Sequence, residues 1–211
     1  MKKCVTICIK LYYFSGGIMK SLVLSTFLMM FLYSFNVGAY SDSEIYTVID
    51  KEDTAKFAEM MAAGIDVDEP DLDGNTPLMI ASALGKDKFV QYLIDMGADV
   101  KRRNYVGVSA LHRAAHGGHN DVVDLLLDNG AIINIPDMDG ITPLMSAVSA
   151  DRRFTVELLV HRGAIISFKN IKGHDALDIA KRKRYGKIVS FLTEALTKPV
   201  KETKVEYSWD N

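Results

Sequence analysis

Apolar residues recur along most of this chain with a period of 33 residues. One series places a large apolar side chain at Met60, Leu93, Leu126, Leu159 and Leu192, and valines precede the four leucines by three residues. A second series pairs Leu78, Leu111, Leu144 and Leu177 with an alanine three residues later, at Ala81, Ala114, Ala147 and Ala180. A spacing of three puts both residues on one helical face, so each unit is predicted to hold two amphipathic helices. One such unit cannot bury its own apolar faces, and the pattern therefore predicts an all-α solenoid of stacked helix-turn-helix units.

Polar residues and glycines punctuate the same period. The residue before the first helix of each unit is a good N-cap type: Ser43, Thr76, Ser109, Thr142 and Asp175. Gly64, Gly97, Gly130 and Gly163 follow the second helix, where a left-handed C-cap favours a residue without Cβ. Gly74, Gly107, Gly140 and Gly173 lie in the turn that leads to the next unit. Each unit is therefore predicted to run as helix, short turn, helix and β-hairpin-like loop.

At these residues the chain resembles the ankyrin-repeat family. The segment 71–78, DLDGNTPL, resembles the family's opening motif, and 96–100, MGADV, resembles its close. The resemblance implies an ankyrin-repeat domain over 40–198, with full repeats at 71–103, 104–136 and 137–169, end caps at 41–70 and 170–198, and a polar tail at 199–211.

Two departures from the family pattern matter. The family histidine after the Pro-Leu pair is present only as His112, and the resemblance implies that it ties the loop backbone. Gly85 and Gly118 mark the turn between paired helices, but Asp151 and Arg184 occupy the equivalent places. We therefore expect looser inter-helix turns in the last two units.

Residues 1–39 contain no Asp or Glu. They carry Lys2, Lys3, Lys10 and Lys20, with the apolar run 21–33 after them, which is the pattern of a signal peptide. Small residues Val37 and Ala39 predict cleavage before Tyr40, and a start at Met19 would make a shorter signal. The alternative is an uncleaved anchor, because residues 21–39 are just long enough to span a bilayer. Either way the lysines stay in the cytoplasm and the rest is exported, so we expect a periplasmic or secreted protein.

Charge and cysteine content exclude several classes of function. The net charge is −2, from 25 basic and 27 acidic residues, and loss of the four N-terminal lysines makes it −6. A strongly basic nucleic-acid binder is thus excluded. The only cysteines, Cys4 and Cys8, precede the predicted cleavage site, which leaves no thiol enzyme, no disulfide framework and no thiolate zinc site. No P-loop or dinucleotide motif is present, and we expect no cofactor.

Three clusters invite a chemical interpretation. His112, His116 and His119 have helical spacings, which would suit a metal-dependent hydrolase, but Arg113 stands where the metalloprotease motif needs Glu. The repeat already accounts for these positions, so we predict neither a metal site nor catalytic residues. Asp66, Asp68, Asp71 and Asp73 resemble a calcium loop superficially, and we assign them to the inter-repeat loop. The basic run 181–184 with Lys187 is expected to be a solvated end face, with docking of an acidic partner as the alternative.

The resemblance also implies where a partner protein binds: on the loop tips and on the first helix of each pair. The tip positions are Leu72, Asp73, Asn75, Tyr105, Val106, Val108, Met138, Asp139, Ile141, Ile171, Lys172 and His174. The first-helix positions are Ala83, Leu84, His116, Gly117, Ser149 and Ala150. Six of the tip residues form a candidate exposed apolar strip: Leu72, Tyr105, Val106, Met138, Ile141 and Ile171. The alternative is that the hairpins pack together and hide part of it.

The resulting hypothesis is a non-catalytic, exported, monomeric scaffold that binds another protein and protects or inhibits an envelope enzyme. It has no nucleic-acid partner, and it touches a membrane only if the N-terminal segment is uncleaved. A secreted effector that binds a host protein is the alternative, and a metal-dependent hydrolase using the three histidines ranks below both.

The signal-peptide prediction is tested by N-terminal sequencing of protein recovered from the cell envelope. We expect the chain to begin at or near Tyr40, since cleavage follows the small residues of the signal. Soluble cytoplasmic protein that retains Met1 or Met19 would contradict export.

Overall fold

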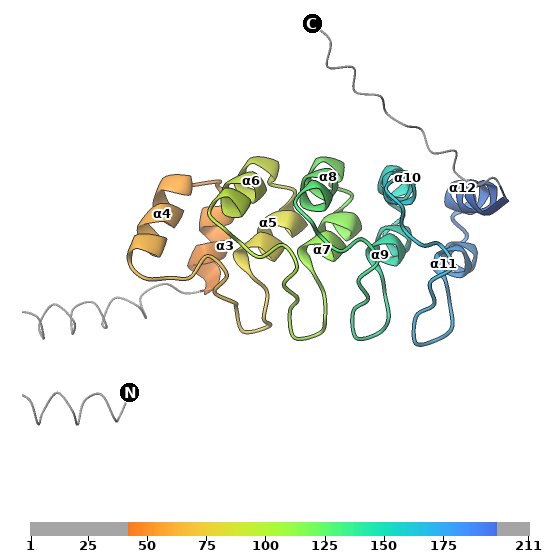
Figure 1. Cartoon of the computed structure of the whole chain (residues 1–211), viewed down its shortest axis with the longest axis horizontal. Coiled ribbons are helices and arrows are strands. Elements are labelled where there is room, and N and C mark those ends of the chain that lie inside the picture. Colours follow the sequence, from red (N-terminus) through yellow and green to blue (C-terminus); the bar gives the residue numbers. More distant parts are fainter. Residues whose placement is uncertain (1–41, 198–211) are drawn as a thin grey trace, which may run out of the picture.

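The computed structural model describes residues 42–197, and the predicted signal peptide at 1–39 and tail at 199–211 lie outside this range. The described part contains ten α-helices and no β-strand, which confirms the all-α fold class (Figure 1). In order they are α3 (Asp42–Asp50), α4 (Thr54–Ala62), α5 (Pro77–Leu84), α6 (Asp87–Asp95), α7 (Ala110–Gly117), α8 (Asn120–Asp128), α9 (Pro143–Ser149), α10 (Arg153–His161), α11 (Ala176–Lys183) and α12 (Gly186–Thr197). Between residues 42 and 197, no helix combines the length and apolar character needed to cross a membrane.

The helices form two parallel layers (Figure 1). The first helices of the pairs, α3, α5, α7, α9 and α11, make one layer, and the second helices make the other. Four long loops connect successive pairs and project from the same side of the stack. The fully buried side chains at 60, 93, 126, 159 and 192 lie between the layers, as the 33-residue series predicts.

Small side chains set the packing within the first layer. Ala81, Ala114, Ala147 and Ala180 are completely buried. Because alanine adds only a methyl group, neighbouring first helices approach closely and share one continuous core. That core runs from Ile45 in the first unit to Leu192 in the last.

The predicted N-caps are confirmed for four of the five units. The side chains of Thr76, Ser109, Thr142 and Asp175 each accept a hydrogen bond from the backbone N–H three residues later. Each cap therefore satisfies one of the backbone donors that a helix leaves unpaired at its start. Ser43 is the exception, because α3 already includes it, and its assignment as an N-cap is wrong.

The expected looser turns in the last two units are also wrong. Asp151 and Arg184 adopt φ angles of 56° and 62°, in the same left-handed region as Gly85 and Gly118. In all four units the backbone N–H that follows the turn donates to the buried alanine's carbonyl, over 2.9–3.1 Å in each case: Lys86 to Ala81, His119 to Ala114, Arg152 to Ala147 and Tyr185 to Ala180. Packing of the two helices imposes the turn, and Asp151 and Arg184 bear its steric cost.

Replacing Arg184 with glycine should therefore stabilise the protein. A left-handed L-residue costs about 1–2 kcal/mol, and glycine returns about 0.5–1 kcal/mol of that as chain entropy. We expect Arg184→Gly to raise the free energy of unfolding by roughly 0.5–1 kcal/mol in urea titrations.

Lys181→Gly is the matched control, because it removes the same charge from a helical position of α11. It should lower the free energy of unfolding by about 1 kcal/mol. Equal destabilisation by both variants would show that the turn at Arg184 carries no strain.

Candidate functional site

An Asp or Asn closes each of the four projecting loops. These residues are Asp71, Asn104, Asp137 and Asn170, again 33 apart. Each side-chain oxygen accepts the backbone N–H groups two and four residues later, over 2.7–3.2 Å. The backbone N–H of the same residue donates to the carbonyl four residues later. Sequence reasoning missed this series, although an Asp or Asn three residues before each loop glycine is a turn signal.

Neighbouring loops are also tied to one another. Tyr105 N–H donates to the Asp73 carbonyl over 3.3 Å, Met138 N–H to Val106 over 3.1 Å, and Ile171 N–H to Asp139 over 3.0 Å. Gly74 makes room for the first of these contacts. Its φ is +81°, and a Cβ there would lie 2.9 Å from the Tyr105 ring. The four tips therefore form one connected row whose backbone is fixed.

Five apolar side chains project from this row, and we call them the tip strip. Their exposed fractions are 90% for Leu72, 64% for Tyr105, 56% for Val106, 71% for Met138 and 69% for Ile171. Asp73, Asp139 and Lys172 lie beside them and are exposed too. The hairpins thus bond through their backbones without covering these side chains.

Four residues assigned to the exposed loop surface lie elsewhere. Asn75 is only 6% exposed: its amide donates to Asp71, and its oxygen accepts from Asn104 and Arg113. Val108, Ile141 and His174 are half-buried, and Ile141 packs on the core. All four follow the loop glycine, where the chain turns back toward its helix, so they are less exposed than the tips.

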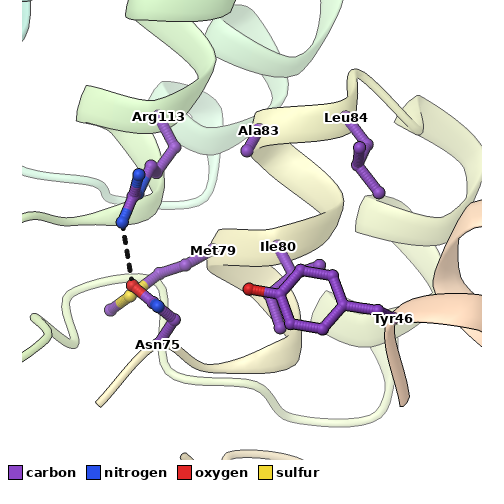
Figure 2. A pocket seen from close by; sticks show the side chains of 7 residues that line it. All are labelled: Tyr46, Asn75, Met79, Ile80, Ala83, Leu84 and Arg113. Carbon is purple, nitrogen blue, oxygen red and sulfur yellow. Dashed lines mark hydrogen bonds between the residues drawn. The ribbon is translucent and has the colours of Figure 1, made fainter. Parts of the chain in front are cut away.

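A small hollow lies on the first-helix layer between α3, α5 and α7 (Figure 2). It is lined by Tyr46, Asn75, Met79, Ile80, Ala83, Leu84 and Arg113. Its volume is about 90 Å³, far below the roughly 300–1,000 Å³ of a small-molecule site. Sequence reasoning had assigned Ala83 and Leu84 to the binding face, but not Tyr46 or Arg113.

Hydrogen bonds at the edge of the hollow fix the charge of Asp71. The Tyr46 hydroxyl donates to its Oδ2 over 3.3 Å, and the Asn75 amide donates to the same oxygen over 3.0 Å. Burial alone would raise the pKa of Asp71, but the hydrogen bonds from Asn75, Asp73 and Tyr46 outweigh it and hold that pKa below its usual value. Burial, followed by the Asp71 charge, raises the pKa of the Tyr46 hydroxyl. Asp71 is therefore an ionised group that belongs to its loop.

The three clustered histidines face different partners. His112 is buried: its Nδ1 accepts from the Ser109 backbone N–H and lies 2.9 Å from the Ser109 hydroxyl, and its Nε2 lies 2.9 Å from the Ile141 carbonyl. His119 Nε2 lies 3.1 Å from the Ala83 carbonyl, and His116 is exposed. His112 thus ties the loop backbone, as the resemblance implies. In the described part of the chain, no three His, Cys, Asp or Glu side chains are grouped to hold a metal ion.

The acidic and basic runs are used locally. Asp66 and Asp68 accept backbone N–H groups within the inter-repeat loops. Lys183 Nζ donates to the Ser149 carbonyl over 2.8 Å, and the residues from 181 to 184 are exposed on the last unit. Both findings agree with the structural interpretation of these runs.

Comparison with known families agrees with this architecture. A model of ankyrin repeats in three copies matches residues 46–137, and a single ankyrin-repeat model matches residues 139–171. Together they cover more than half of the chain. No curated protein matches it.

The environment of His112 predicts a pH dependence of stability. Burial lowers its pKa in the folded protein, whereas the pKa of an unfolded histidine is about 6.5. Below that pH the unfolded chain takes up a proton that the folded chain does not, so the free energy of unfolding falls as the solution is acidified.

His112→Met is the matched variant, because Met79 and Met145 occupy the equivalent buried positions of neighbouring units. Urea titrations between pH 7.5 and 5.5 should show a smaller loss of stability for the variant. The slopes of unfolding free energy against pH should differ between the two proteins by an amount that approaches, and does not exceed, about 1.4 kcal/mol per pH unit. Parallel curves for both proteins would exclude His112 as the source of the pH dependence.

Proposed function

The chain belongs to the ankyrin-repeat family, whose members are generally non-catalytic scaffolds that bind proteins, and we propose that this member is exported and binds its partner through the loop tips and the first-helix face. The partner in this proposal is an envelope enzyme that the scaffold protects or inhibits.

The tip strip is the observation that carries the proposal. Isolated exposed apolar residues are ordinary on a protein surface, but a row of them that repeats along four successive loops indicates an interaction site. Leu72, Tyr105, Met138 and Ile171 occupy the same position of successive units and are all exposed. A surface of this kind gains free energy when a partner covers it.

The fixed backbone of the tips favours binding as well. Each loop is closed by its Asp or Asn, and each tip bonds to the next. A preorganised surface loses little chain entropy on association, so more of the contact energy appears as affinity. The exposed Asp73, Asp139 and Lys172 would supply the polar rim that protein interfaces carry.

Export rests on the pattern of residues 1–39, which precede the described part of the chain. The same pattern supports a secreted effector that binds a host protein. Cell fractionation separates the two: retention in the envelope favours the scaffold for an envelope enzyme, and release into the medium favours the effector.

Tyr105→Ala tests the tip strip. The partner is first isolated from envelope extract with the tagged wild-type protein and identified by mass spectrometry. We expect the variant to lose about 2 kcal/mol or more of binding free energy by calorimetry, because tyrosine supplies a large rigid contact area. Its stability should change by no more than about 1 kcal/mol, since the ring is largely exposed.

Lys181→Ala is the control, because it changes an exposed residue of the last unit. It should affect binding only slightly and in a salt-dependent way. Strong loss with Lys181→Ala and none with Tyr105→Ala would move the interface to the basic end of the stack. Unfolding by Tyr105→Ala would contradict its assignment as a surface residue.

A further inference from the structure

The hollow between α3, α5 and α7 combines an apolar floor with an accessible rim. Met79 and Ile80 of α5 form its buried floor, and the exposed Ala83 and Leu84 extend the same apolar surface toward solvent. Tyr46 closes the side formed by α3, opposite Arg113 of α7 (Figure 2). Its small volume suits one inserted side chain of a larger molecule.

Arg113 gives the hollow a cation with unused donors. One guanidinium nitrogen donates to the Asn75 oxygen over 3.0 Å, the bond drawn as a dashed line in Figure 2. A guanidinium carries five N–H donors in all. Three other arginines of the described stack pair with carboxylates, namely Arg102, Arg153 and Arg162, and the remaining ones form no ion pair there. No carboxylate described between residues 44 and 197 forms an ion pair with Arg113.

Asp71 bonds to Tyr46 and Asn75 at the edge of the hollow, and it forms no ion pair with Arg113 among the described residues. Asp71 accepts four hydrogen bonds, from the backbone N–H groups of Asp73 and Asn75, the Asn75 amide and the Tyr46 hydroxyl. Its oxygens are therefore occupied within the loop. Among the described residues that line the hollow, Arg113 is the only charged one, and the hollow is complementary to a carboxylate.

The residues that line the hollow are not repeated in the neighbouring units. The positions 33 residues before and after Arg113 are Ile80 and Ser146, and those after Leu84 are Gly117 and Ala150. A hydrogen bond links the hollow to the loop that carries Tyr105: the Asn104 amide donates to Asn75, and Asn104 directly precedes Tyr105.

We propose that this hollow anchors a linear segment of the partner protein in which an apolar side chain lies beside a carboxylate. The apolar side chain packs on Met79, Ile80 and Leu84, and the carboxylate pairs with the Arg113 guanidinium. This inference rests on the proposed scaffold function and names the chemistry of the partner at one position of the binding face.

The test uses acetylated, amidated hexapeptides whose central pair is leucine–glutamate, leucine–glutamine or serine–glutamate. Binding to the full chain is followed by the methyl NMR signals of Met79 and Leu84. We expect the leucine–glutamate peptide to shift both signals saturably and to bind about tenfold more tightly than the leucine–glutamine peptide, since hydrogen bonds to charged groups are the stronger kind. The serine–glutamate peptide should bind too weakly to saturate.

Two variants assign the preference to its residues. Arg113→Gln should abolish the preference for glutamate over glutamine, because it removes the positive charge. Leu84→Ser, a change at an exposed residue, should abolish the preference for leucine over serine. Arg184→Gln removes the same charge at the far end of the stack and should leave both preferences intact. Unfolding midpoints of all variants verify that they fold.

Equal binding of the glutamate and glutamine peptides would overturn the proposal, as would a preference that survives Arg113→Gln. A chain that lacks residues 199–211 is also compared with the full chain. If the deletion shifts the Met79 and Leu84 signals without any peptide, the chain's own tail occupies the hollow and the proposal is wrong.

The isolated partner separates this inference from the scaffold function. If Tyr105→Ala weakens its binding and neither Arg113→Gln nor Leu84→Ser does, the scaffold stands and the hollow is not its anchor.

Discussion

Close contact between neighbouring first helices is the constraint on which the rest of this structure depends. Ala81, Ala114, Ala147 and Ala180 of these helices are fully buried, and successive units share one core. Since a single unit cannot bury its apolar faces, any larger side chain here would separate the units and expose the core. The same close approach brings the loops within hydrogen-bonding distance, so the helix layer determines the row of tips.

The row of tips explains how the protein keeps large apolar side chains in water without losing order. Two sets of hydrogen bonds hold the loop backbones, one to the closing Asp or Asn and one to the next tip. The side chains of Leu72, Met138 and Ile171 are consequently left largely in solvent, and the Tyr105 ring covers Gly74 of the preceding loop while remaining largely exposed. A surface held mainly by backbone hydrogen bonds is free to carry binding specificity in its side chains.

Departures from the repeat create the individual features of the stack. Arg113 and Leu84 have no counterpart of the same type in the neighbouring units, and together with Tyr46 they shape the hollow. His112 is the single histidine among equivalent positions otherwise filled by tyrosine, methionine or aspartate, and burial lowers its pKa. The repeated positions determine the helix stack, and the positions that depart from the repeat determine the hollow and the buried His112.

The sequence by itself determined the features that depend on residues close together in the chain. The two helices per unit, the N-caps at Thr76, Ser109, Thr142 and Asp175, and the left-handed glycines all follow from local spacing and local hydrogen bonds. The exposed tips at Tyr105 and Met138 could also be placed, because loop tips project wherever a solenoid turns.

Only the tertiary structure decided what depends on contacts between units. Asn75 is buried because Asn104 and Arg113, 29 and 38 residues away, bind its oxygen. Arg184 adopts a glycine's conformation because packing of α11 on α12 fixes the turn. The hollow exists because three helices from successive units meet there, and the distances between such side chains are set by how the units stack.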